Sequence, residues 1–117
     1  MTKPTLSACL RTKRMYISRG TIMQLGAPSH LSFWFDEKEY LLYVSATRQD
    51  DLDAYEIPKH FWNRPISCTV ARIAFVKALQ YRLKWEDGSR YSYVGMSSER
   101  EGVPAVAFNM TEGTRLR

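Results

Sequence analysis

The stretch ISRGTIMQLGAPSHLSFWFDEKEYLLYVSA, residues 17–46, predicts a short helix followed by a β-hairpin. Ser18 is a suitable N-cap, because its hydroxyl can accept a hydrogen bond from a backbone N–H of the first helical turn. Gly26 suits the left-handed residue that ends a helix, and Pro28 prevents continuation. We therefore expect a helix of about two turns between Ser18 and Gly26.

The hairpin follows from alternation. Leu31, Phe33 and Phe35 alternate with Ser32 and Trp34. This is the pattern of a strand with one buried face. Residues 36–39, DEKE, form a polar turn, and YLLYV then supplies the returning strand.

A similar pattern recurs about fifty residues later, in ISCTVARIAFVKALQYRLKWEDGSRYSYVGMS, residues 66–97. Apolar residues at helical spacing predict a helix over 68–77. Alternation in LQYRLKW predicts a strand over 79–85, and the Asp-Gly pair at 87–88 is a strong hairpin turn signal. RYSYVGM, residues 90–96, is then the returning strand, so the chain contains two strand–helix–hairpin units.

The remaining segments complete a single domain over residues 1–117. Residues 1–8 are expected to be a loose lead-in and CLRTKRMYI, residues 9–17, one strand. Residues 50–55, DDLDAY, are expected to form one helical turn, and HFWN, residues 60–63, to pack on the core. SEREG, residues 98–102, is expected to be a charged loop and VPAVAFNM, residues 103–110, the last strand. The expected organisation is a first repeat at 9–46, a connector at 47–65, a second, degenerate repeat at 66–110 and a frayed tail at 111–117.

Residues 14–46 resemble the AbrB/SpoVT-like swapped-hairpin family. Arg14 leads into MYIS where the family has an arginine before Ile-Pro, RGTIMQLG occupies the family's short helix, and LSFWFDEKEYLLYV is similar to its final hairpin. The resemblance implies a mainly β fold with short helices, an AbrB-like double-hairpin barrel that two repeats in one chain would close as a pseudo-dimer.

The chain also departs from the family pattern. Ser18 stands where the family has proline, and Ile22 and Met23 stand where such proteins often carry an arginine pair. We therefore transfer no DNA contact to these helix positions. Of the basic residues, only Arg14 maps directly onto a basic position of the family.

Charge is distributed unevenly along the chain, whose formal net charge is +5. Residues 1–35 carry five bases and no acid, residues 36–56 carry seven acids and two bases, and the remainder is basic again. A basic surface is the usual electrostatic footprint of a nucleic-acid partner, although it can equally be a solvated face.

Two sets of basic residues are candidates for DNA contact. The first comprises bases on the first strand and the loop near it: Arg11, Lys13, Arg14 and Arg19. The second lies on the outer face of the expected second hairpin: Arg82, Lys84 and Arg90. Charges on exposed strands also discourage edge-to-edge aggregation, which is the interpretation we favour for the second set.

Strand aromatics have three alternative roles. Trp34, Tyr43, Tyr81, Trp85, Tyr91 and Tyr93 fall on expected strands. They could stack on bases, fill a small barrel or anchor a protein interface.

Catalytic and metal-binding patterns are missing from the sequence. Cys9 and Cys68 lack the close spacing of zinc ligands, with His30 and His60 isolated from them, so we expect reduced thiols and no metal. DDLD, residues 50–53, could bind a hard cation but lacks the spacing of a calcium loop. His60 is more readily a surface histidine than an acid or base. No phosphate-binding glycine loop, nucleophile elbow or His-Glu-x-x-His occurs, so we expect no catalytic residues, no cofactor and no enzyme.

The leading hypothesis is a small prokaryotic DNA-binding protein, a transcription regulator or antitoxin-like module that binds duplex DNA through its basic first strand. The alternative is a phage or mobile-element inhibitor that binds a protein, for example of the anti-CRISPR type. A subunit of a larger assembly, or a homodimer, is a third option. Without a signal-peptide core or a membrane-spanning apolar run, we expect a cytoplasmic protein with no membrane partner.

Overall fold

The computed structural model describes residues 3–47, 54–63, 67–70 and 72–116. Most elements in these ranges are strands: β1 (Thr5–Cys9), β2 (Arg14–Ser18), β3 (His30–Asp36), β4 (Leu41–Ala46), β5 (Tyr55–Glu56), β6 (Ser67–Val70), β7 (Arg90–Arg100), β8 (Val103–Asn109) and β9 (Thr114–Leu116). The helices are short: α1 (Arg19–Gln24), α2 (Lys59–Asn63) and α3 (Ile73–Leu83). The expectation of a mainly β chain with short helices is confirmed.

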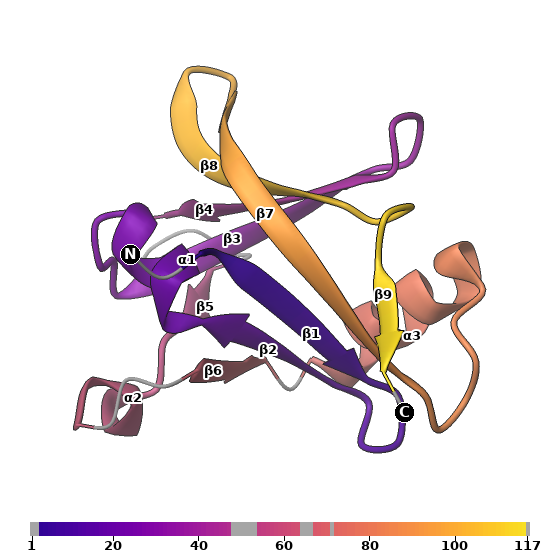
Figure 1. Cartoon of the computed structure of the whole chain (residues 1–117). Coiled ribbons are helices and arrows are strands. Elements are labelled where there is room, and N and C mark those ends of the chain that lie inside the picture. The colour runs from indigo at the N-terminus through magenta and orange to yellow at the C-terminus, as the bar shows by residue number, and fades with distance from the viewer. Residues whose placement is uncertain (1–2, 48–53, 64–66, 71, 117) are drawn as a thin grey trace.

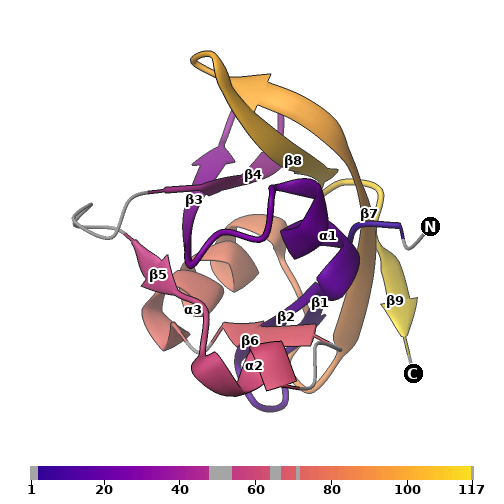
Figure 2. The same cartoon turned by 90° about the vertical axis from the view of Figure 1, so that its left-hand side faces the viewer.

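The strands form one curled sheet in the order β5-β3-β4-β8-β7-β1-β2-β6, with β9 also paired to β7. Every pairing among the described strands is antiparallel. Figures 1 and 2 show the sheet curving into a half-barrel, with β7 crossing from one half to the other. Residues 90–94 of β7 pair with β1, and residues 95–100 pair with β8.

The N-terminal hairpin differs from the expected single strand. Thr5–Cys9 and Arg14–Ser18 are two paired strands, joined by a polar turn in which Lys13 has a φ of 56°. The prediction of a loose lead-in over residues 1–8 is therefore wrong from Thr5 onward. Leu6 and Ala8 alternate with polar residues and are buried, so this segment carries an ordinary strand pattern.

The helix and the hairpin of the first unit form as expected. The backbone N–H of Thr21 donates to Ser18 Oγ over 3.3 Å, which caps α1, and Gly26 adopts a φ of 87° just beyond it. β3 and β4 pair from Leu31 opposite Ala46 to Asp36 opposite Leu41. The Asp36 carboxylate accepts from two backbone N–H groups of the acidic turn, which fixes the hairpin end.

The second unit folds differently. Ser67–Val70, expected to begin a helix over 68–77, form β6 against β2, and the helix runs instead over Ile73–Leu83. The predicted strand over 79–85 is therefore wrong. Val76 and Leu79 are buried one turn apart, whereas Tyr81, which the alternation placed inward, is 84% exposed. The segment fits a helical periodicity as well as the alternation of a strand. The helix forms because α3 buries one apolar stripe, with Val76 and Leu79, on the concave side of the sheet.

The Asp-Gly turn consequently joins α3 to β7 and not two strands, with Gly88 at a φ of 76°. β7 includes Ser98, Glu99 and Arg100, so the expected charged loop is mostly strand, and the turn to β8 lies at 101–102. The strand expected over residues 103–110 is confirmed as β8, but it is not the last strand, because β9 follows it. The tail is not frayed, because β9 pairs with β7 from Thr114 opposite Ser92 to Leu116 opposite Arg90.

The core fills the concave side of the sheet. Strands contribute Leu6, Met15, Ile17, Leu42, Val44, Val106 and Phe108, each no more than 1% exposed. Phe61 of α2 is also buried, which confirms that the connector packs on the core. The helical turn expected at 50–55 lies partly outside the described residues, and its last residue, Tyr55, begins β5.

Candidate nucleic-acid interface

The convex side of the first half of the sheet is basic and polar. Leu6, Ala8, Met15 and Ile17 point into the core, so the alternate residues of β1 and β2 point outward. We call part of this surface the basic face and define it by seven residues of β1, β2, β7 and the turn between β1 and β2: Ser7, Cys9, Arg11, Arg14, Tyr16, Arg90 and Ser92.

Register sets the arrangement of the face. Cys9 pairs with Arg14 on one side and with Arg90 on the other. Because neighbouring strands lie about 4.8 Å apart, the Cα atoms of the two arginines are about 10 Å apart. Ser7 in the same way lies between Tyr16 and Ser92.

Acidic residues are missing from this half of the sheet. Within its described strands, namely β1, β2, β6, β9 and residues 90–94 of β7, there is no Asp or Glu. Arg11, Arg14 and Arg90 are exposed, and none of them forms an ion pair with a described residue. Their charge is therefore available to an anion from solvent.

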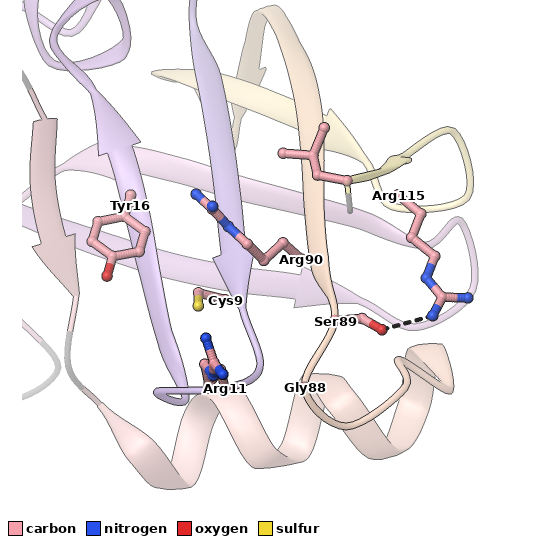
Figure 3. Close-up of a pocket in the computed structure, with 8 residues that line it drawn as sticks. Cys9, Arg11, Tyr16, Gly88, Ser89, Arg90 and Arg115 are labelled. Atoms are coloured by element: carbon pink, nitrogen blue, oxygen red, sulfur yellow. Dashed lines mark hydrogen bonds between the residues drawn. The ribbon is translucent and has the colours of Figure 1, made fainter.

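A pocket of about 900 Å³ opens on the basic face, lined by Cys9, Arg11, Tyr16, Gly88, Ser89, Arg90, Arg115 and Leu116. Figure 3 shows the Arg90 side chain crossing β1 toward Tyr16, with Cys9 and Arg11 beside it. Arg115 is turned away, toward Ser89. It donates to Ser89 Oγ over 3.0 Å and pairs with Glu86 over 2.7 Å. Two of the three pocket arginines therefore have no acidic partner among the described residues.

The pocket also holds a polarised thiol. Hydrogen bonding from the Thr12 side chain lowers the pKa of Cys9, with smaller contributions from the backbone of Thr12 and Arg11 and from the charge of Arg90, against the opposing effect of partial burial. Burial raises the pKa of the other cysteine, Cys68, to about 11. The environment around Cys9 thus favours negative charge, as the arginines themselves would.

The first predicted basic set is divided by the structure. Arg11 and Arg14 belong to the basic face. Lys13 instead bonds Asp87 Oδ1 over 2.5 Å and Gln80 Oε1 over 2.7 Å, which ties the β1–β2 turn to the connection after α3. The same contacts, Lys13 first and then Gln80, lower the pKa of Asp87. Arg19 begins α1, at the opposite end of β2 from Arg14.

The second predicted basic set does not lie on one hairpin. Arg82 belongs to α3 and pairs with Glu37 over 2.9 Å, and Lys84 is the left-handed C-cap of that helix. The edge-protection interpretation fails for both, because neither lies on a strand. Only Arg90 is on a strand, and it joins the basic face.

Of the eight residues that line the pocket, only Arg11 and Arg90 belong to the predicted basic sets, and Tyr16 and Arg115 are the main additions. Tyr16 alternates with Arg14 in the sequence, and that alternation was the available signal once Arg14 was chosen. Arg115 lies in a tail expected to be frayed, and nothing local in the sequence indicates that the tail returns to β7.

Three of the six aromatic residues expected on strands pack inside. Trp85 and Tyr93 are buried, and the indole N–H of Trp85 donates to Tyr93 Oη over 2.7 Å. Tyr91 stacks on Trp85 with ring centroids 5.7 Å apart. These rings fill the core and are closed to bases, while Tyr81 lies on a helix.

Trp34 and Tyr43 instead point outward on the second half of the sheet. Register aligns Trp34, Tyr43, Ala107 and Met96 across four strands. The Trp34 and Tyr43 rings lie 5.5 Å apart, and the guanidinium carbon of Arg100 sits 3.7 Å from the Trp34 ring centroid. We call these residues, Trp34, Tyr43, Met96, Arg100 and Ala107, the aromatic face.

No group of three His, Cys, Asp or Glu side chains in the described ranges could hold a metal ion, and DDLD lies outside those ranges. No described helix has the length and apolar character needed to cross a membrane. Comparison with known proteins gives no match: no family model fits the chain, and no curated protein or solved structure matches it significantly.

Proposed function

We propose that the protein binds duplex DNA by contacting phosphates with Arg11, Arg14 and Arg90 on the basic face. The observation that carries the proposal is that none of these three arginines has an acidic partner among the described residues, on a half-sheet whose described strands contain no acid. A planar guanidinium suits bidentate contact with phosphate, and such contacts release counterions.

A role as a transcription regulator or antitoxin-like module extends this proposal. Its support is the strand–helix–hairpin order of β2, α1, β3 and β4, which matches the likeness of residues 14–46 to the AbrB/SpoVT-like family. Arg14, the family-like basic position, lies one strand away from Cys9 and two from Arg90. A tandem AbrB-like pseudo-dimer stays a prediction.

Fluorescence anisotropy with random duplex DNA, titrated with salt, tests the proposal. The expected result is tight binding at low salt that falls linearly on a log–log plot. The triple variant Arg11→Glu, Arg14→Glu, Arg90→Glu should weaken binding at least about 100-fold at low salt and reduce the slope by about 3.

The matched control reverses the same number of charges elsewhere. Lys38→Glu, Lys59→Glu, Lys77→Glu changes three exposed lysines on a hairpin turn and two helices, away from the basic face. It should weaken binding much less than the arginine triple. Equal losses would mean that net charge alone drives binding, and no binding of the native protein at low salt would refute the proposal.

The second candidate is a protein-binding inhibitor of the phage or mobile-element type. The aromatic face favours it, because Trp34 is 40% and Met96 68% exposed and because Trp, Tyr, Met and Arg are enriched at protein interfaces. In that case the variant with all three arginines changed to Glu would still bind and inhibit its protein partner, and Trp34→Ala would not.

A further inference from the structure

We infer that the pocket on the basic face holds one unpaired nucleotide, with its phosphate on Arg11 and Arg90 and its base on the ring of Tyr16. This inference rests on the proposed function and deepens it, since it names the nucleic-acid unit that the face selects. The nucleotide can come from a single-stranded overhang of DNA or from a free mononucleotide, because the two share the same phosphate and base.

The size and shape of the pocket give the first argument. Contact with the backbone of a duplex needs only exposed cations, whereas this face is hollowed to about 900 Å³. Pockets for small molecules typically measure about 300–1,000 Å³, which is far more than a phosphate alone requires. The space therefore fits a phosphate together with a sugar and a base.

The placement of charge gives the second argument. Arg11 reaches the pocket from the β1–β2 turn and Arg90 from β7, on either side of Cys9. Arg115, at the far wall, is held by Glu86 and Ser89. The positive charge available to a phosphate is thus concentrated at the end of the pocket shared with Tyr16.

Tyr16 gives the third argument. Its cross-strand neighbours are Ser7 and Thr69, whose side chains are short, and Figure 3 shows its ring beside β2. The ring is half-buried and lines the pocket. Bases in a duplex are stacked on one another and cannot use this ring, whereas an unpaired base can stack on it.

Three ligands distinguish contact with a duplex, binding of an unpaired nucleotide in DNA and binding of a free nucleotide. They are a blunt duplex, the same duplex with a four-nucleotide overhang, and a free mononucleotide such as dTMP. We expect the overhang to raise the affinity about tenfold over the blunt duplex. Tyr16→Leu should reduce this advantage to less than about twofold, and Tyr16→Phe, which keeps the ring, should preserve it.

Alkylation of Cys9 by iodoacetamide supplies a second measurement on the unmodified chain. Cys9 lines the pocket, so a bound nucleotide should slow its modification several-fold, while buried Cys68 serves as the internal reference. Protection by dTMP at micromolar to millimolar concentration would show that a free nucleotide enters. Protection by the overhang duplex alone would assign the pocket to nucleic acid.

The outcomes distinguish the two proposals. Duplex binding with no overhang advantage and no protection of Cys9 would overturn the inference and leave the proposed function standing. Binding of dTMP with protection of Cys9, but no binding of duplex, would support the pocket and overturn the proposed function. An overhang advantage that survives in Tyr16→Leu would overturn the assignment of Tyr16.

Discussion

The convex surface of the sheet is basic on one half and aromatic on the other. Two arginines on the same strand show the difference. Arg90 and Arg100 both point outward from β7, ten residues apart along the strand. Arg90 extends over β1 with no acidic partner in the described chain, whereas the guanidinium carbon of Arg100 lies over the Trp34 ring, 3.7 Å from its centroid.

The same side chain therefore has two roles. On the basic face the guanidinium of Arg90 lies over β1, exposed and available to a phosphate. On the aromatic face it covers a ring, and its buried Nε has no hydrogen-bond partner among the described residues. The surroundings of the two side chains differ: Arg90 pairs across the strands with Cys9 and Leu116 and is exposed, whereas an indole gives Arg100 a cation–π contact.

The largest expected effect comes from the joint between the halves. At Gly95, where β7 passes from β1 to β8, an added Cβ would lie 2.6 Å from Val106 Cγ1 and 2.8 Å from Phe108 Cε1. Gly95→Val should lower the free energy of unfolding by about 3 kcal/mol, measured by urea denaturation. Ser92→Val, outward on the same strand, should change it by less than about 0.5 kcal/mol. Equal stabilities would show that the joint tolerates a side chain.

The second effect concerns the two thiols of the basic half, Cys9 outside and Cys68 inside. The folded-state pKa of Cys68, about 11 against an ordinary 9.0, means that its stabilising contribution is complete below pH 9 and is lost as the pH rises through 11. Between pH 9 and pH 11, the free energy of unfolding of the native protein should fall by about 2–3 kcal/mol more than that of Cys68→Ala.

Cys9→Ala is the matched control, because the pKa of Cys9 is shifted in the opposite direction to that of Cys68. The lowered pKa of Cys9 gives a contribution that is present above the unfolded-state pKa and is lost as the pH falls through the folded-state pKa. Urea denaturation at pH 8, 9, 10 and 11 measures all three proteins. Parallel profiles for native protein and Cys68→Ala would contradict the burial of that thiol.

How much of this arrangement follows from sequence depends on which interactions fix each element. α1 and the β3–β4 hairpin are set by local signals, such as the Ser18 cap, Gly26 and strict alternation, and they were predicted. Residues 79–83 satisfy both a strand and a helix period, and only the buried stripe of Val76 and Leu79 against the sheet selects the helix.

The candidate site was predicted in part for the same reason. Arg11 and Arg14 lie three positions apart in the sequence, Arg11 predicted from its charge and Arg14 also from the family resemblance. Arg90 and Arg115 reach the pocket only because β7 pairs with both β1 and β9, contacts between residues more than 20 positions apart. The sequence gives no sign that Lys13 bonds Asp87, because the two residues lie 74 positions apart.

A third, smaller effect separates the two arginines of β7. Arg100→Ala should lower the free energy of unfolding by about 1 kcal/mol, because it removes the cation–π contact and the cover over Trp34. Arg90→Ala should change stability by less than about 0.5 kcal/mol, since its side chain is exposed. Urea denaturation followed by tryptophan fluorescence measures both, and Arg100→Lys, which keeps charge but loses the planar stack, should fall between native and Arg100→Ala. A greater loss of unfolding free energy in Arg90→Ala than in Arg100→Ala would contradict the assignment of the stabilising contact to Arg100.

The smallest effect tests which cations of the β1–β2 turn can reach DNA. Arg11 has no acidic partner in the described residues, so Arg11→Ala should reduce the salt slope of duplex binding by about 1. Lys13 is bonded to Asp87 and Gln80, so Lys13→Ala should reduce the slope by much less. Asp87→Ala should release Lys13 toward the phosphates and tighten binding slightly, because it also removes a negative charge close to the pocket. Anisotropy at matched salt concentrations measures the three variants. Equal slopes for Arg11→Ala and Lys13→Ala would mean that the pair with Asp87 opens when DNA binds, so that the boundary of the basic face would have to include Lys13.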